Sequence, residues 1–472
     1  GNIMPGDKIK VELFYTELLV PENGTYEFAY PTVVGPRYAE EFTSDAMYAD
    51  NWIHTPYGKE GQMFYEYNIN ATVQAGMPLS EVKCTTHKVD IDLKNKQVAH
   101  IKLNPLDKNA GNRDFVFTYK LAGDQIQSGL LLFEGKDENF FLAMMQPPKV
   151  VTADIMPPRE YVFILDVSGS MRGFPLEITK ELLQNLLAQL RPEDRFNVMM
   201  FESGSNMLSK ESIPANKNNI KDALAVIDEV KGGGGTNILG ALKDAFAFKE
   251  TQGFSRSFIV VTDGYITIEQ DAFDLIRKNL GNANLFAVGA GSSVNRLLIE
   301  GMARAGQGEP LFVSEGKEAS AKAEKFRKYI SAPVLTNIKV DFGGLDVYDV
   351  EPLSYPDVMA ERPVIIYGKY KGNASGNITL SGLTGGGKSY TQTINANATA
   401  PSASNQAIRY LWAREQIKIL NDYNALHVST DIMKQVTELG LKYNLLTNYT
   451  SFIAVDPTQR DKNGELVTVK QA

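Results

Sequence analysis

The sequence predicts a multidomain protein that combines α/β and all-β parts. We expect a doubly wound, Rossmann-like domain with a parallel sheet, flanked by β-sandwich-like regions and followed by a C-terminal helical segment. Three observations predict this. Short alternating strands fill the first third of the chain, apolar strands alternate with helices in the middle, and alternation returns after Pro333. The 472 residues suffice for roughly three domains.

The N-terminal part is predicted to be β-rich, with one β-rich domain at residues 39–156. Apolar and polar residues alternate, as in half-buried strands, over Lys8–Tyr15, Thr25–Tyr30, Tyr65–Asn70 and Lys88–Leu93. Turn-forming residues separate these segments. Many short strands at such spacing are typical of a sandwich.

The middle of the chain, residues 157–330, is predicted to be the doubly wound domain. Its expected strands are apolar throughout, as in a sheet covered on both faces: Tyr161–Leu165, Phe196–Phe201, Ser257–Thr262 and Asn284–Val288. Its expected helices lie near Leu176–Leu190, Ile220–Val230, Ile238–Phe248, Ala272–Leu280 and Val294–Ala305. This order predicts βαβ units.

The C-terminal part is predicted to contain a second β-rich domain at residues 331–404 and a helical segment at residues 405–472. The expected strands are Ile338–Phe342, Pro363–Tyr370, Asn377–Leu380 and Tyr390–Ile394. Two helices, Asn405–Leu420 and Asp431–Leu441, and a final strand, Ser451–Val455, complete the chain.

Composition excludes several functions. With 48 Lys+Arg against 56 Asp+Glu, the chain lacks the basic excess of a nucleic-acid or anionic-membrane binder. A single cysteine, Cys84, excludes an internal disulfide, and the 4 scattered histidines disfavour a zinc site. No apolar run of about 18 residues is present to span a bilayer. The opening residues, Gly1-Asn2-Ile3, suggest a trimmed chain whose targeting segment has been removed.

Polar side chains follow two of the buried strands. Asp166-x-Ser168-x-Ser170 follows the first strand, and Asp263 follows Thr262 at the end of another. Between them, a glycine run leads into Thr236 at the start of a helix. Loops at the carboxyl ends of parallel strands meet at one edge of the sheet, so we expect the five side chains to converge.

Two carboxylates and three hydroxyls form an all-oxygen set, which suits Mg²⁺, Mn²⁺ or Ca²⁺ rather than zinc. We expect Ser168 and Ser170 to bind directly, Thr236 directly or through water, and Asp166 and Asp263 largely through water. An ion with mostly neutral ligands keeps its charge and favours an acidic oxygen from a partner. The alternative is that Asp166 and Ser168 only cap the following helix.

These five positions match the metal-ion-dependent adhesion site of von Willebrand factor type A domains. Three further segments resemble inter-α-trypsin inhibitor heavy chains and their bacterial relatives: Ser331–Ile338, Leu411–Arg414 and Tyr443–Phe452. Residues 1–38 resemble the C-terminal part of a VIT domain, the module that precedes the type A domain in those proteins. The chain is similar to the bacterial relatives over nearly its whole length.

The resemblance implies a secreted, cell-surface or periplasmic binding protein without enzymatic activity. It implies Mg²⁺, Mn²⁺ or Ca²⁺ at the adhesion site and a protein or extracellular-matrix partner that supplies an acidic residue. The vertebrate heavy chains end in an Asp-Pro-His-Phe sequence joined to chondroitin sulfate, whereas this chain has Asp456-Pro457-Thr458-Gln459. We therefore do not expect transfer to hyaluronan.

Several alternatives stay open at this point. In one alternative the ion only stabilises loops in a structural envelope protein. In another it assists hydrolysis, although no histidine accompanies the motif. Gly382–Ser389 matches the P-loop pattern of nucleotide hydrolases with Lys388, but alternating residues follow it, which favours a hairpin turn. Glu202 is either a solvated charge or a group near the ion, and Gly232–Gly235 either a hinge or a plain loop.

Overall fold

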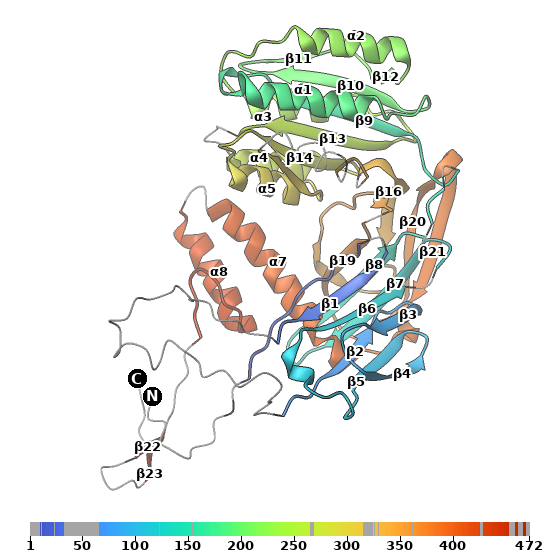
Figure 1. Cartoon of the computed structure of the whole chain (residues 1–472), viewed down its shortest axis with the longest axis vertical. Coiled ribbons are helices and arrows are strands. Elements are labelled where there is room, and N and C mark those ends of the chain that lie inside the picture. Colours follow the sequence, from blue (N-terminus) through green and yellow to red (C-terminus); the bar gives the residue numbers. More distant parts are fainter. Residues whose placement is uncertain are drawn as a thin grey trace.

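The computed structural model describes most of the chain. The described residues are 10, 12–22, 24–32, 66–121, 123–148, 150–152, 154–264, 269–314, 324, 326–328, 330–360, 362–424, 428–452, 458–460 and 466–468. An α/β domain lies at one end of the molecule, and β-sandwiches and a helical hairpin lie beneath it (Figure 1). Within the described ranges, no helix has both the length and the apolar character needed to cross a membrane.

The α/β domain is built on one mostly parallel sheet, which confirms the predicted fold class. Strands β10, β9, β13, β14 and β15 run parallel, and the short strands β11 and β12 pair antiparallel with β10. The strands are β9 (Arg159–Asp166), β10 (Arg195–Phe201), β11 (Ser205–Met207), β12 (Ile213–Pro214), β13 (Ser255–Thr262), β14 (Asn284–Ala290) and β15 (Pro310–Val313).

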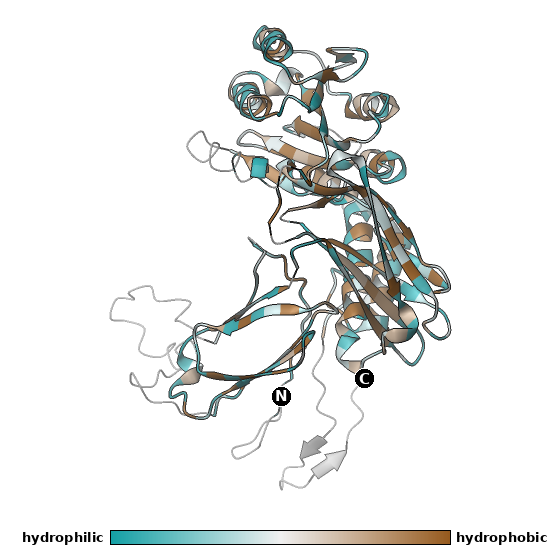
Figure 2. Ribbon diagram, turned by 90° about the vertical axis from the view of Figure 1, so that its right-hand side faces the viewer, coloured by the Kyte–Doolittle hydropathy of each residue, from teal (hydrophilic) through white to brown (hydrophobic). Residues whose placement is uncertain are grey.

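Helices cover both faces of this sheet. On β9, Tyr161, Phe163 and Leu165 pack towards helices α1 and α2. Val162 and Ile164, which point to the opposite face, pack towards α3, α4 and α5. Figure 2 shows these helices nearly end-on with apolar strands between them. The helices are α1 (Phe174–Leu187), α2 (Lys217–Asp228), α3 (Ile238–Ala247), α4 (Glu269–Asn279) and α5 (Arg296–Ala305).

A β-sandwich next to this domain is assembled from both sides of it in the sequence. One of its sheets has the order β17-β19-β8-β7, so the two regions expected as separate β-rich domains share a sheet. Its core joins Phe141 of β8 to Ile366 of β19 and Leu380 of the facing sheet. The strands are β7 (Gln127–Glu134), β8 (Asn139–Gln146), β16 (Pro333–Asp341), β17 (Val347–Glu351), β18 (Val358–Met359), β19 (Val364–Tyr370), β20 (Asn377–Thr384) and β21 (Lys388–Asn395).

A smaller sandwich is formed by N-terminal residues. Its two three-stranded sheets, β1-β6-β3 and β2-β5-β4, enclose Val73, Ile101, Phe115 and Phe117. The strands are β1 (Tyr26–Tyr30), β2 (Asn70–Gln74), β3 (Leu79–Cys84), β4 (Val89–Asn95), β5 (Val98–Leu103) and β6 (Phe115–Leu121). A separate two-stranded sheet pairs β22 (Thr458–Arg460) with β23 (Leu466–Thr468).

The two predicted C-terminal helices form a hairpin that packs on the outer face of strand β8. They are α7 (Ala407–Asn424) and α8 (Thr430–Tyr443). Phe140 and Leu142 of β8, on the face opposite Phe141, pack against Trp412 and Tyr443 of the hairpin. The 3-10 helices of the described residues are η1 (Ala110–Asn112), η2 (Gly169–Met171), η3 (Gly385–Gly387), η4 (Ala396–Ala398) and η5 (Ala403–Gln406).

Two predicted strands differ from the structure. The described part of Lys8–Tyr15 carries no strand, and the alternating segment Tyr65–Asn70 precedes strand β2, which begins at its last residue. Alternation alone does not make a strand, because a strand also needs a neighbour to satisfy its backbone hydrogen bonds. Most of the predicted final strand, Ser451–Val455, lies outside the described residues, and Ser451 and Phe452 are not in a strand.

Candidate functional site

The carboxyl ends of strands β9 and β13 bring the first site residues together. Asp166 ends β9 and is paired with Phe201 of β10, and Thr262 ends β13 on the other side. The Thr262 hydroxyl donates to Oδ2 of Asp166 at 2.6 Å. Asp263 follows directly and is buried, with 4% of its surface exposed. Both predicted carboxylates therefore lie at the same edge of the sheet.

The turn after β9 orients the two serines. The backbone N–H of Ser168 donates to Oδ1 of Asp166 at 2.9 Å, which ties the turn back to the strand end. The Ser168 and Ser170 Oγ atoms lie 3.2 Å apart. Ser168 is buried and Ser170 exposed, so the pair of hydroxyls leads from the carboxylates to the surface.

Asp166 carries its charge in a buried position. Its two oxygens accept hydrogen bonds from neutral donors, the Ser168 N–H and the Thr262 hydroxyl. Burial raises the pKa of Asp166 and the charge of Asp263 raises it further, although the bonds from Ser168 and Thr262 oppose this. A buried carboxylate that accepts hydrogen bonds from neutral donors favours a nearby cation, and oxygen ligands suit a hard cation.

The glycine loop that leads to Thr236 is held against this turn. Gly169 N–H donates to Gly234 O at 3.1 Å, and Gly233 N–H donates to Val167 O at 2.9 Å. Thr236 is half-buried at the end of the loop, and none of the described hydrogen bonds joins it to the other four site residues. The structure thus places Thr236 in the loop beside the site, and the loop is fixed by its backbone bonds.

Two charged side chains flank the glycine loop. Arg172 Nε donates to Gly232 O at 2.9 Å, and the carboxylate of Glu202 lies over Gly234, where a Cβ would come 2.8 Å from Glu202 Cδ. Both charged residues are exposed. Sequence reasoning considered Glu202 but missed Arg172. The only local signal was a charged residue two positions beyond Ser170.

The donor set differs from that of an acid-rich or thiolate metal centre. Among the described residues, no group of three or more His, Cys, Asp or Glu side chains could hold an ion. A metal at this edge would therefore depend on the hydroxyls and on water together with Asp166 and Asp263, as the sequence predicts.

The P-loop-like segment forms a hairpin. Strands β20 and β21 pair directly across it, with Thr384 opposite Lys388, and η3 makes the turn. A P-loop needs a helix after its lysine to hold phosphate at the helix N-terminus. Here Lys388 begins a strand, so the prediction of a glycine-rich hairpin turn is confirmed.

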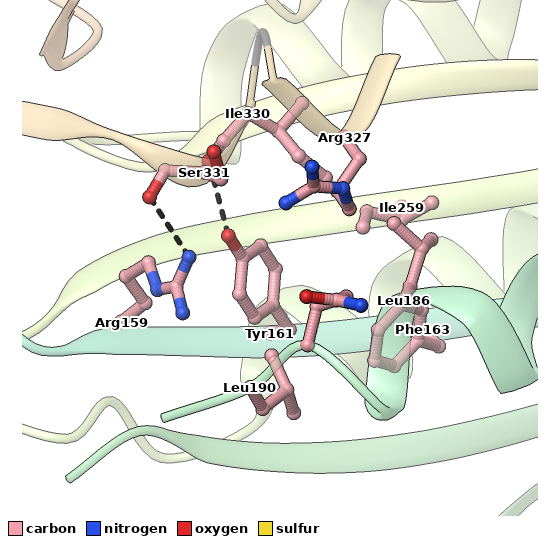
Figure 3. A pocket seen from close by; sticks show the side chains of 10 residues that line it. Arg159, Tyr161, Phe163, Leu186, Leu190, Ile259, Arg327, Ile330 and Ser331 are labelled. Atoms are coloured by element: carbon pink, nitrogen blue, oxygen red, sulfur yellow. Dashed lines mark hydrogen bonds between the residues drawn. The ribbon is translucent and has the colours of Figure 1, made fainter. Parts of the chain in front are cut away.

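A small cavity lies at the opposite end of strand β9 (Figure 3). Its volume of about 20 Å³ has room for about one water molecule. The cavity is bordered by contacts that join the start of the domain to its end, with Arg159 Nη1 donating to Ser331 O at 2.8 Å and Tyr161 OH donating to Ile330 O at 3.0 Å. The cavity is therefore part of the domain junction and distinct from the edge that carries Asp166.

A network of charges fixes the same junction. Asp194, fully buried, accepts hydrogen bonds from Arg159 Nε at 3.0 Å and from Arg191 Nη2 at 3.0 Å. Arg191 Nη2 also donates to Pro157 O at 2.9 Å. Through these two arginines, the Asp194 carboxylate connects Pro157, before strand β9, to Ser331, after the domain.

Comparison with known proteins identifies the domain. Residues 159–312 match the family model of the von Willebrand factor type A domain. The α/β domain of this chain is therefore a type A domain, and the predicted resemblance is confirmed.

Two relatives match more of the chain than the type A domain alone. It is 30% identical over 321 residues to a von Willebrand factor A domain-containing protein of Dictyostelium discoideum, covering 65% of this chain and 15% of that protein. It is 25% identical over 392 residues to inter-alpha-trypsin inhibitor heavy chain H2 of Sus scrofa, covering 78% of this chain and 39% of the heavy chain. The chain thus spans well under half the length of either relative.

A solved structure titled von Willebrand factor type A from Catenulispora acidiphila is also similar. The TM-score is 0.47 at 16% sequence identity, and the match covers 68% of this chain and 87% of the other.

Proposed function

We propose that this chain is a divalent-cation-dependent binding protein without enzymatic activity, acting in a secreted, cell-surface or periplasmic setting. Asp166, Ser168, Ser170, Thr236 and Asp263 hold Mg²⁺, Mn²⁺ or Ca²⁺. The ion supplies a positive centre for a carboxylate of a protein or matrix partner. One observation carries the proposal: the Ser168 and Ser170 hydroxyls, 3.2 Å apart, lead from the buried Asp166 to the surface.

The described histidines supply no general base for hydrolysis at this site. General-base catalysis needs a titratable group within reach of the reacting proton. Of the described histidines, His87 and His100 lie on the small N-terminal sandwich, and His54 and His427 fall outside the described residues. Neither described histidine is thus on the domain that carries the site.

The test begins with the ion alone. We expect Mn²⁺ to bind the full chain by calorimetry, and Asp263→Asn to raise its dissociation constant more than tenfold, because ligand charge sets the affinity of such sites. The control is Asp222→Asn on α2, an exposed carboxylate away from the site edge, which should bind Mn²⁺ like the wild type.

The second step uses a capped peptide with a single Glu as the probe. In Mg²⁺ we expect the wild type to bind it, and Asp263→Asn or added chelator to abolish binding. Mg²⁺ that raises the melting temperature while the peptide stays unbound would overturn the proposal and favour an ion that only stabilises loops.

A further inference from the structure

Arg172 is an exposed arginine beside the site. Among the described residues, no carboxylate lies within salt-bridge distance of its guanidinium. Other arginines of the domain contact carboxylates, namely Arg159, Arg191, Arg256, Arg277, Arg296, Arg304 and Arg327. The unpaired charge of Arg172 is therefore available to a ligand.

The position of Arg172 is fixed by the same turn that carries the serines. Its Nε donates to Gly232 O at 2.9 Å, which leaves the four N–H groups of Nη1 and Nη2 for another acceptor. A Cβ built on Gly232 would meet both Arg172 Cγ, at 3.0 Å, and Ser168 O, at 3.2 Å. Gly232 thus lies against both the aliphatic part of the Arg172 side chain and the turn that contains Ser168.

The negatively charged side chain of Glu202 lies against the same glycine loop at a later position. Glu202 covers Gly234, whereas Arg172 covers Gly232 and lies near Gly233, where a Cβ would be 3.4 Å from Nη2. An acidic group that approaches the site is attracted on the Arg172 side and repelled on the Glu202 side. A planar guanidinium with free N–H groups fits a carboxylate in a two-bond arrangement.

We propose that Arg172 determines the specificity of this site for acidic partners that carry a second carboxylate. One carboxylate occupies the ion, and the second is paired with Arg172 on the side away from Glu202. This proposal rests on the proposed function, since it concerns how the same site selects among acidic ligands.

The experiment compares capped peptides with one Glu and with two Glu residues separated by none to four glycines, on the full chain in Mg²⁺. At the best spacing we expect the two-Glu peptide to bind about fivefold more tightly, the upper range for an exposed ion pair and above the roughly twofold gain from having two equivalent groups. The gain should shrink in high salt.

Three variants test whether the charge of Arg172 causes the preference for the two-Glu peptide. Arg172→Gln should bind Mn²⁺ as the wild type does, but keep only the twofold gain of the two-Glu peptide over the one-Glu peptide. Arg172→Lys should retain part of the preference because it retains the charge. Lys217→Gln, at the other end of α2 and about 18 Å along that helix from the glycine loop, should keep the full preference.

The outcomes are distinguishable. If the one-Glu peptide does not bind the wild type in Mg²⁺, the proposed function fails and the inference fails with it. If both peptides bind but Arg172→Gln keeps the fivefold gain, only the inference is overturned. Equal loss of Mn²⁺ affinity in Arg172→Gln and Arg172→Lys would also overturn it, because the arginine would then serve only to hold the loop through Gly232.

Discussion

Gly234 shows how single positions hold the glycine loop in place. Its φ of +77° lies in the left-handed region that disfavours other residues, and its carbonyl accepts from Gly169 N–H. A side chain there would also press on Glu202. The identity of this residue therefore affects how closely the loop approaches the Ser168 turn.

We predict that Gly234→Ala destabilises the protein by roughly 1 kcal/mol and lowers its Mn²⁺ affinity, because both the backbone strain and the contact with Glu202 shift the loop. The matched control is Gly253→Ala, which has a φ of +82° in a turn with nothing within 4 Å of a built Cβ. It should lose similar stability but keep its Mn²⁺ affinity. Equal affinities in the two variants, measured by calorimetry, would contradict the prediction.

At the residue scale, four of the five site residues could be placed from sequence because they sit at or just after strand ends. Asp166, Ser168 and Ser170 are local neighbours, and Asp263 follows a second strand that lies beside the first. Arg172 could not be recognised in this way. Its significance depends on Gly232, which the fold brings back from a distant part of the chain.

The helical hairpin is anchored to the sandwich through Glu138, at the turn between β7 and β8. Glu138 accepts from Tyr443 OH at 2.7 Å and pairs with Lys369 at 2.9 Å and Lys442 at 3.0 Å. Burial alone would raise the pKa of Glu138, but hydrogen bonds from these three groups lower it to about 2. The ionised carboxylate thus stabilises the packing of α8 on the sheet.

The sign of the pH dependence follows from the lowered pKa. The stabilisation is fully present above the ordinary pKa of 4.5 and is lost as the pH falls from there towards 2. We predict that Glu138→Gln costs about 2 kcal/mol at pH 7 and progressively less below pH 4.5. Urea unfolding between pH 7 and pH 3 measures this.

The control for Glu138 is Asp137→Asn, an exposed neighbour in the same turn, which should follow the wild type at every pH. A difference between Glu138→Gln and the wild type that stays constant down to pH 3 would show that the charge of Glu138 is not responsible.

At the element scale, long amphipathic or fully apolar segments were predicted well. The helix expected at Leu176–Leu190 is α1, Phe174–Leu187, and the strand expected at Tyr161–Leu165 lies within β9. The N-terminal strands were harder to predict from sequence. Alternation over Lys8–Tyr15 has no strand partner among the described residues. Strand β8 does not alternate, because both of its faces contact other parts of the protein.

Across the whole molecule, helix α5 of the type A domain contacts helix α7 through an ion pair. Arg304 Nε donates to Asp422 Oδ2 at 2.7 Å, and Nη2 donates to Oδ1 at 2.5 Å. Arg277 of α4 similarly contacts Glu351 of β17 at 3.0 Å. These pairs fix the type A domain against the parts of the chain that follow it.

We predict a coupling free energy of about 1 kcal/mol between Arg304 and Asp422 in a double-mutant cycle with Arg304→Ala and Asp422→Ala, because the pair is bidentate and partly buried. The control cycle uses Lys249 and Glu211, an exposed pair at 3.4 Å within the domain, which should give little coupling. Thermal unfolding of the four proteins in each cycle supplies the values. Equal coupling in both cycles would contradict a role for Arg304 in holding the domain.

The sharing of a sheet between distant segments could not be predicted from sequence. Strand β8 precedes the type A domain, and its neighbour β19 follows it. Neither strand carries a local signal for the other, since β8 is apolar on both faces and would also suit a sheet made wholly of N-terminal strands.

The pairing of β8 with β19 has a mechanical consequence. When the chain is pulled from both ends, tension passes across the seven residue pairs from Asn139–Tyr370 to Met145–Val364 before it reaches the type A domain. The buried Arg159–Asp194 network adds a second bridge where the domain begins and ends. Asp166 and Asp263 lie at the opposite ends of their strands from this junction, outside the path of the force. The geometry around Asp166 and Asp263 is therefore shielded from a force that is applied along the chain.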